Sequence, residues 1–156
     1  MFRINRRTDY AVRVMVCLAR HAPGMRLPTQ VIQSEMRIPP RLLRRIIADL
    51  ARVGLVNTFA GPRGGLELSF PAGTIRLRHI WEAIEGPLLI TDCLEGVQAC
   101  PLETGCPVNR HWLRLQARIV RELDSITLKE LAAEAGGLPE GLYLRAASRI
   151  SALLEI

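Results

Sequence analysis

Apolar residues recur at the three- and four-residue spacing of a helix face in three stretches near the start of the chain. We expect the first helix to be capped by Thr8 and to end near His21. A second short helix fits residues 29–36. A third begins at Pro39–Pro40 and ends before Gly54, because proline fits a helix entry and glycine a left-handed helix end. The buried face predicted for this third helix consists of Leu42, Leu43, Ile46, Ile47, Leu50 and Val53.

The stretch LVNTFAGPRGGLELSF, residues 55–70, predicts a β-hairpin. Two runs of strand-forming residues flank a Gly/Pro cluster, and such clusters close hairpins. Three short helices with tight connections are typical of a helix-turn-helix, and a hairpin that follows the last helix is a wing. We therefore expect a mainly α fold with a small β-hairpin wing. Residues 1–85 would form this winged helix-turn-helix, closed by a helix in LRHIWEAIEG.

Residues 86–107 are rich in Pro, Gly and polar residues and are expected to form a loop. From residue 108 an apolar position follows every three or four residues, which predicts a long helix with one narrow apolar stripe. Such a stripe suits a helix–helix dimer seam, and packing onto its own domain is the alternative. The stripe consists of Val108, Trp112, Leu115, Ile119, Leu123 and Ile126.

Residues 108–156 are assigned to this dimerisation helix and to further C-terminal helices. Thr127 and Glu130 fit a capping box, which predicts that a new helix starts there. Gly136–Gly137 would end that helix, and a last amphipathic helix is expected in the tail.

The composition narrows the class of protein. Hydrophobic residues make up 49% and charged residues 23%, as in an ordinary globular protein. No stretch approaches the roughly 18 unbroken apolar residues of a membrane helix, and the basic, polar start does not fit a signal peptide. We therefore expect a cytoplasmic protein, where structural disulfides are rare. The three histidines fall in unrelated segments without a nucleophile–base pair, so neither an enzyme nor a small-molecule substrate is expected.

Positive charge is concentrated in the first half of the chain. Residues 1–78 hold 14 arginines and four acidic residues, whereas the remainder holds 7 basic and 11 acidic ones, and the whole chain carries +6. Such asymmetry favours a polyanion such as double-stranded DNA as the partner of the N-terminal half. The alternative is that arginine is simply this chain's solvating cation, because 20 of its 21 basic residues are arginine.

Three arginines mark the helix expected to read DNA. In a helix-turn-helix the second helix of the motif enters the major groove, and its N-terminal residues meet the base edges. With the apolar face turned inward, Arg41, Arg44 and Arg45 fall on or beside the opposite face. The planar guanidinium can pair with guanine O6 and N7 or with phosphate. Taken singly, each arginine could also be a solvated surface charge.

The wing offers a further DNA contact. Arg63 lies beside Gly64 at the predicted tip, and a tip without a bulky side chain can approach the duplex closely. Arg63 would then enter a minor groove or contact the backbone. We add Thr29, at the start of the second helix, and Arg7, in the basic N-terminal segment, to the predicted DNA-binding surface.

Three cysteines, Cys93, Cys100 and Cys106, lie in the predicted loop. Zinc fingers and ribbons usually pair cysteines two to four residues apart, and this spacing lacks such pairs. Thiolates spread over a loop can instead surround an iron–sulfur cluster, whose irons each need an outside ligand. A Cys3His zinc site that uses His111, or three unpaired thiols, are the alternatives. Cys17 sits within an apolar helix and is expected in the core.

These features resemble the iron–sulfur winged-helix repressors that include the cluster-assembly regulator IscR, the nitric-oxide sensor NsrR and the iron-responsive regulator RirA. The resemblance covers nearly the whole chain. It rests on TDYAVRVMV (8–16), GLVNTFAGPRGGLEL (54–68), the three cysteines and ELDSITLKELA (122–132). The stretch ACPLETGCPVN (99–109) is most similar to the NsrR and RirA branches.

The resemblance implies a homodimer, crossed through the long helix, that binds a near-palindromic operator and represses transcription. It also implies that Cys93, Cys100 and Cys106 hold the cluster. In the IscR branch a histidine three residues after the last cysteine completes the site, and this chain has Asn109 there. In the NsrR branch an aspartate from the other subunit is the fourth ligand, and Asp9 matches it. The alternative for Asp9 is a first-turn carboxylate favoured by the helix dipole.

Three thiolates and one carboxylate would serve a [4Fe–4S] cluster with one ligand per iron, and the resemblance favours this cluster over [2Fe–2S]. The implied function is a transcriptional repressor whose operator binding is controlled by an iron–sulfur cluster that senses nitric oxide, iron or redox state. A winged-helix transcription factor with structural zinc or no metal is the alternative.

Overall fold

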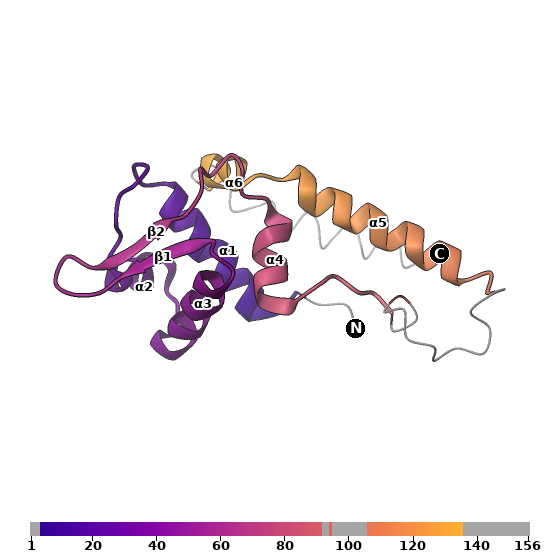
Figure 1. Cartoon of the computed structure of the whole chain (residues 1–156), viewed down its shortest axis with the longest axis horizontal. Coiled ribbons are helices and arrows are strands. Elements are labelled where there is room, and N and C mark those ends of the chain that lie inside the picture. Colours follow the sequence, from indigo (N-terminus) through magenta and orange to yellow (C-terminus); the bar gives the residue numbers. More distant parts are fainter. Residues whose placement is uncertain (1–3, 92–93, 95–105, 136–156) are drawn as a thin grey trace, which may run out of the picture.

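In the computed structural model, which describes residues 4–91, 94 and 106–135, three helices precede a single hairpin and three follow it (Figure 1). The predicted mainly α fold with a small β-hairpin wing is confirmed. Gly136–Gly137, the tail helix, Cys93 and Cys100 lie outside the described residues. The elements are α1 (Arg6–Ala19), α2 (Thr29–Met36), α3 (Pro40–Arg52), β1 (Val56–Phe59), β2 (Gly65–Leu68), α4 (Leu77–Glu85), α5 (Asn109–Ser125) and α6 (Leu128–Glu134).

The start of α1 differs from the prediction that Thr8 caps it. The N-cap is Asn5, whose side chain accepts a hydrogen bond from the Arg7 backbone N–H at 3.0 Å. Asparagine is as good a cap as threonine, so the helix gains its first turn three residues earlier. Thr8 is only 2% exposed, and its hydroxyl donates to the Glu85 carboxylate at the end of α4. A buried hydroxyl needs such a partner, which explains why Thr8 serves the α1–α4 contact instead of the cap.

The core lies where α1, α2, α3 and α4 meet the inner face of the hairpin. The predicted inner positions of α3 are confirmed for Leu43, Ile46 and Leu50, which are fully buried. Val53 was wrongly predicted to be buried and is 45% exposed. The helix ends at Arg52, and Gly54 then turns the chain in the left-handed region at φ +74°, so Val53 leaves the apolar face.

The wing is an antiparallel pair in which Val56 faces Leu68 and Phe59 faces Gly65. Leu27 adds an isolated bridge along the outer edge of β2, because it exchanges both backbone hydrogen bonds with Leu66 at 2.8 and 2.9 Å. Gly65 makes this approach possible: it has φ +151°, and a Cβ atom there would lie 2.4 Å from the Leu27 carbonyl oxygen. The wing is thereby tied to the segment that leads into α2.

Helix α5 projects away from the winged domain (Figure 1) and buries none of its residues. Its C-terminal end returns to the domain through two backbone hydrogen bonds, from Leu77 N to Ile126 O at 3.0 Å and from Leu128 N to Ile75 O at 2.8 Å. The predicted capping box is confirmed at the start of α6, where the Thr127 and Glu130 side chains bond reciprocally to backbone N–H groups. Division of the remaining chain into a loop at 86–107 and a dimerisation region at 108–156 stays a prediction.

In the part of the chain that the structure describes, no helix has both the length and the apolar character needed to cross a membrane.

Candidate nucleic-acid interface and metal-binding residues

The outward face of α3 carries Arg41, Arg44 and Arg45, and all three are exposed. Among the described residues, no carboxylate lies within ion-pair distance of any of the three. Leu43, Ile46 and Leu50 on the other face belong to the core. The predicted separation of α3 into an apolar inner face and a basic outer face is therefore observed at these residues. Three unpaired guanidinium groups on one exposed helix face are suited to phosphate and guanine contacts.

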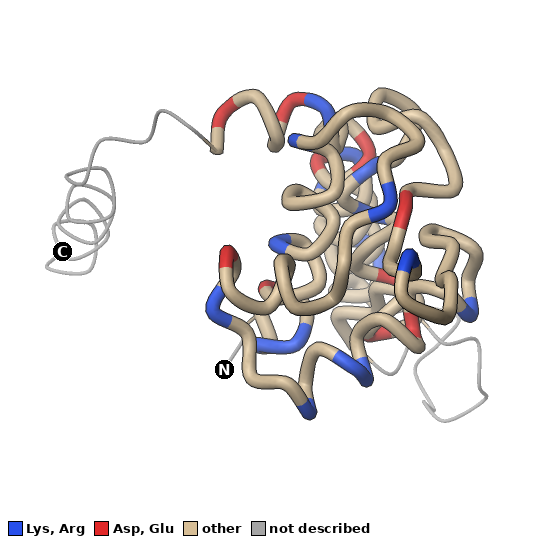
Figure 2. The backbone as a smooth tube through the Cα atoms, turned by 90° about the vertical axis from the view of Figure 1, so that its left-hand side faces the viewer, with Lys and Arg blue, Asp and Glu red and all other residues tan. Residues whose placement is uncertain are grey.

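The connection between α2 and α3 is short, as a helix-turn-helix requires. Arg37 adopts the left-handed conformation at φ 50° and ψ 46°, and the Ile38 N–H bonds back to the Gln33 carbonyl at 3.3 Å. Thr29 is the first residue of α2 and is half-buried. Figure 2 shows basic positions gathered along the lower part of the face that carries the hairpin. The geometry thus presents one basic edge to a partner.

Gly64 at the wing tip has an internal role that the sequence did not indicate. The Gly64 N–H donates to the Gly61 carbonyl at 2.9 Å, which closes the turn beside the exposed Arg63. A Cβ atom on Gly64 would lie 2.2 Å from the Phe59 carbonyl oxygen and 2.8 Å from that of Gly61. The turn itself therefore requires glycine, whatever the tip contacts.

Gly64→Ala is expected to destabilise the protein by about 1–3 kcal/mol, because the new methyl group displaces backbone atoms that cannot yield as a side chain would. Thermal unfolding followed by circular dichroism measures the effect. Gly73→Ala is the matched control, since its Cβ would meet only the flexible Lys129 side chain at 3.9 Å. Equal melting temperatures for the two variants would contradict the requirement for glycine at the tip.

Arg7 is engaged inside the protein. Its guanidinium forms an ion pair with Asp49, and Asp49 also accepts from Arg52 at 3.4 Å. The Arg7 Nε atom is buried without a hydrogen-bond partner among the described residues. Arg7 therefore links α1 to α3, and its predicted contact with DNA, which this ion pair would oppose, stays a prediction.

Arg26, in the segment that leads into α2, is a basic residue beside the wing that the sequence analysis did not single out. Its guanidinium lies over the Phe59 ring, 3.6 Å from the centroid, and 3.7 Å from the Glu67 carboxylate. These contacts fix the cation on the outer face of the hairpin and partly neutralise it. Arg26, Phe59 and Glu67 meet because the Leu27 segment pairs with β2. No local sequence pattern predicts that pairing.

The predicted metal ligands are only partly described. Cys106 is half-buried just before α5, whereas Cys93 and Cys100 lie outside the described residues. Asp9 is exposed in the first turn of α1 and pairs with Arg13 at 2.8 Å. The described residues bring no three metal-binding side chains together in one chain. His111, the alternative zinc ligand, is exposed on α5.

Cys17 is a core residue, as predicted. It is fully buried, and its thiol donates to the Glu35 carboxylate at 3.4 Å. Burial, aided by Glu35, raises the pKa of the Cys17 thiol to about 12. The thiolate that would bind metal or react with oxidants is therefore unfavourable at neutral pH.

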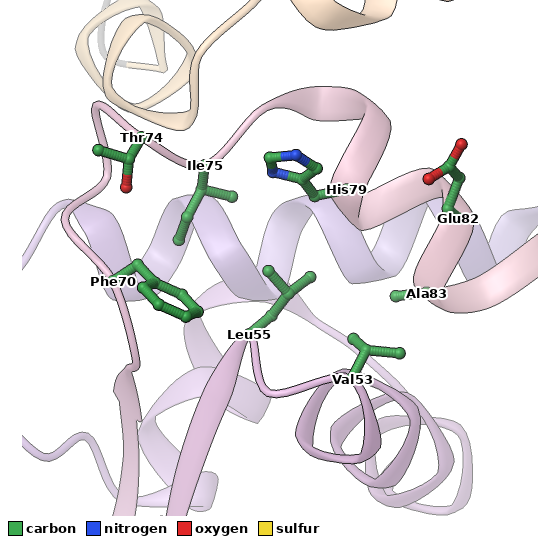
Figure 3. A pocket seen from close by; sticks show the side chains of 8 residues that line it. All are labelled: Val53, Leu55, Phe70, Thr74, Ile75, His79, Glu82 and Ala83. Carbon is green, nitrogen blue, oxygen red and sulfur yellow. The ribbon is translucent and has the colours of Figure 1, made fainter.

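An apolar hollow of about 500 Å³ lies between the end of α3, the base of the hairpin and α4 (Figure 3). Val53, Leu55 and Phe70 contribute much of its wall. The polar side chains at its rim are held by neighbours: His79 Nδ1 accepts from the Arg76 N–H at 3.1 Å, and Glu82 pairs with Arg78 at 2.7 Å. No nucleophile–base arrangement forms among these described residues.

Comparisons with known proteins agree with this geometry. Residues 4–134 match the Rrf2 family, described as an iron-dependent transcriptional regulator. A putative HTH-type transcriptional regulator of Mycobacterium tuberculosis is 32% identical over 139 residues, which cover 88% of this chain and 84% of that protein. The HTH-type transcriptional regulator IscR of Vibrio vulnificus is 31% identical over 125 residues, covering 80% of this chain and 74% of that protein.

Solved structures with the same fold include CymR, the global cysteine regulator of B. subtilis, with a TM-score of 0.70 and 25% identity over 85% of this chain and 98% of that chain. T. potens IscR superimposes with a TM-score of 0.69 at 23% identity, over 92% of this chain and 96% of that chain. With the exposed basic face of α3 beside a glycine-closed wing, the family match identifies the chain as a DNA-binding transcriptional regulator of the Rrf2 family.

Proposed function

We propose that this protein is a homodimeric repressor whose binding to a near-palindromic operator is controlled by an iron–sulfur cluster. The observation that carries the DNA-binding part is the basic face of α3, where Arg41, Arg44 and Arg45 are exposed and have no ion-pair partner among the described residues. The other face of this helix holds the fully buried Leu43, Ile46 and Leu50. In each subunit this face would enter the major groove, and Arg63 at the wing tip would reach the adjacent minor groove or backbone.

The donor set suits a cluster. Cys93, Cys100 and Cys106 would supply three thiolates, and Asp9 of the other subunit a carboxylate, which gives one ligand for each iron of a [4Fe–4S] cluster. The exposed position of Asp9 on α1 and its surface pairing with Arg13 leave it accessible to a second chain. The half-buried Cys106 lies three residues before the start of α5. When bound, the cluster would supply a group that reacts with nitric oxide or oxygen, or responds to iron supply.

The proposed dimer forms through α5. The stripe that was predicted from the sequence is half-buried at Ile119 and Leu123 and exposed at Trp112 and Leu115. An exposed run of large apolar side chains on a projecting helix is an unusual feature for a monomer and fits a helix–helix seam. The two operator half-sites would then lie about one helical turn, roughly 34 Å, apart.

The metal content of protein purified without oxygen tests the proposal. We expect about four iron and four sulfide ions per chain, lost when Cys93, Cys100 and Cys106 are replaced by alanine together. Cys17→Ala is the matched control, because it removes a cysteine that is buried in the core and should leave the metal content unchanged. An Asp9→Ala variant should lose the cluster faster than wild type on exposure to air.

Other results would change the proposal. Two iron and two sulfide ions per chain would indicate a [2Fe–2S] cluster. Zinc alone would favour the winged-helix factor with a structural metal, and no metal in any form would remove cluster sensing while leaving DNA binding intact.

A further inference from the structure

The segment that leads from α4 toward the cysteines, residues 86–91, runs beside α5 (Figure 1). Gly86 ends α4 at φ +82°, with its N–H bonded to the Glu82 carbonyl at 3.1 Å. Leu88 is then 8% exposed and Leu89 40% exposed, so the segment turns one side chain inward and the next outward. The connecting segment is therefore packed against the protein at Leu88.

One hydrogen bond joins the end of the connecting segment to the long helix. The Ile90 N–H donates to the Gln116 side-chain oxygen at 3.3 Å, in a partly buried contact. Gln116 is half-buried, whereas the α5 residues 110–115 before it and 117–118 after it are exposed. Beyond it, the Leu94 N–H bonds to the Thr91 carbonyl at 3.1 Å.

This contact is a second point of attachment for α5. The first lies at its C-terminal end, where Arg78 pairs with Asp124 at 3.1 Å and Leu77 N bonds to Ile126 O. Gln116 precedes Asp124 by eight residues, which is about 12 Å along the helix axis. A helix held at one end can pivot, and a second attachment at this distance fixes its direction.

On the basis of the proposed function, we propose that Gln116 is a positioning residue that couples the cysteine-bearing segment to α5. Its hydrogen bond holds Ile90, three residues before Cys93, against the helix through which the two subunits would join. A change at the cysteines is then transmitted through Ile90 and Gln116 to the direction of α5. That direction sets the spacing of the two recognition helices on the operator.

Two substitutions separate the hydrogen bond from the packing. Gln116→Leu keeps a side chain of similar size and removes the acceptor, whereas Gln116→Glu keeps an acceptor oxygen. Arg118→Leu places the same leucine at an exposed position of α5 and serves as the control. All three variants are made in the full chain, and their dimeric state is checked before comparison.

The first readout is amide hydrogen exchange at Ile90 in metal-free protein, followed by NMR. We expect Gln116→Leu to speed this exchange by roughly 3- to 10-fold, as for loss of one net hydrogen bond, and Gln116→Glu and Arg118→Leu to retain the wild-type rate. An unchanged Ile90 rate in Gln116→Leu would overturn the proposed attachment.

The second readout is the ratio of operator dissociation constants between the cluster-loaded and metal-free forms. We expect this ratio to move toward one in Gln116→Leu and to return to the wild-type value in Gln116→Glu. A wild-type ratio in Gln116→Leu would overturn the coupling role even if the exchange result holds. Wild-type protein that assembles no cluster would overturn both the proposed sensing and the coupling, while the exchange measurement would still decide whether Gln116 holds Ile90.

Discussion

Replacing Arg41, Arg44 and Arg45 together by alanine is expected to weaken operator binding by on the order of 10³-fold or more. Each well-placed arginine contact with a base or phosphate contributes about 1–3 kcal/mol, and a dimer would lose the contacts of two recognition helices. The fold should survive, because the three side chains are exposed while the core positions of α3 lie on its other face.

Fluorescence anisotropy with an operator duplex, measured over a series of salt concentrations, tests this prediction. The slope of log affinity against log salt should become shallower, since fewer phosphates are neutralised. A variant with Arg114, Arg118 and Arg121 replaced by alanine is the control, because it removes the same charge from exposed positions of α5, far from the hairpin (Figure 1). An equal loss of operator affinity in the two variants would mean that α3 contributes only positive charge and makes no specific contact with DNA.

The elements that the sequence predicted well are those whose signals are local. The bounds of α2 follow from its apolar positions, the start of α3 follows from Pro39 and Pro40, and the wing follows from two strand-like runs around a Gly/Pro cluster. In each case a neighbouring residue carries the information, so no knowledge of the tertiary structure is needed.

The misses depend on partners far along the chain. Thr8 has the chemistry of a helix cap, and only its contact with Glu85, 77 residues away, assigns it to the core. The ion pair of Arg7 with Asp49, 42 residues away, was likewise not foreseen, although the predicted contact of Arg7 with DNA stays a prediction. A periodic pattern states which face of a helix is apolar but not which polar side chain a distant element will engage.

The candidate cluster site shows the same limit. The spacing of the three cysteines indicates thiolate chemistry, but convergence of ligands on one metal group depends on a second subunit and on residues outside the described ones. Gln116 carries no signal in the sequence, because a glutamine on an amphipathic helix is ordinary until a backbone N–H without a strand partner lies beside it. The role of such a residue depends on its tertiary contacts, so it cannot be predicted from the sequence alone.

Leu115→Asp is expected to convert the protein to a monomer and to reduce operator affinity by about 10²- to 10⁴-fold. Burying a carboxylate without a partner in an apolar seam costs several kcal/mol of dimerisation free energy. We expect this cost to exceed the stabilisation from the remaining apolar contacts of the seam. A monomer reaches one half-site only, so the gain from binding both half-sites at once is lost. The monomer should stay folded, because α5 buries none of its side chains in the described structure.

Leu113→Asp is the control, because it places the same charge on the opposite face of α5, outside the predicted dimer seam. Leu113 and Leu115 are the same residue type with similar exposure, 50% and 43%, but successive helical positions differ by about 100°, which places them on nearly opposite sides of α5. Sedimentation velocity should therefore show a dimer for Leu113→Asp and a monomer for Leu115→Asp. A dimer in both cases would remove α5 as the seam, and with it the route by which the cysteine-bearing segment could alter the spacing of the recognition helices.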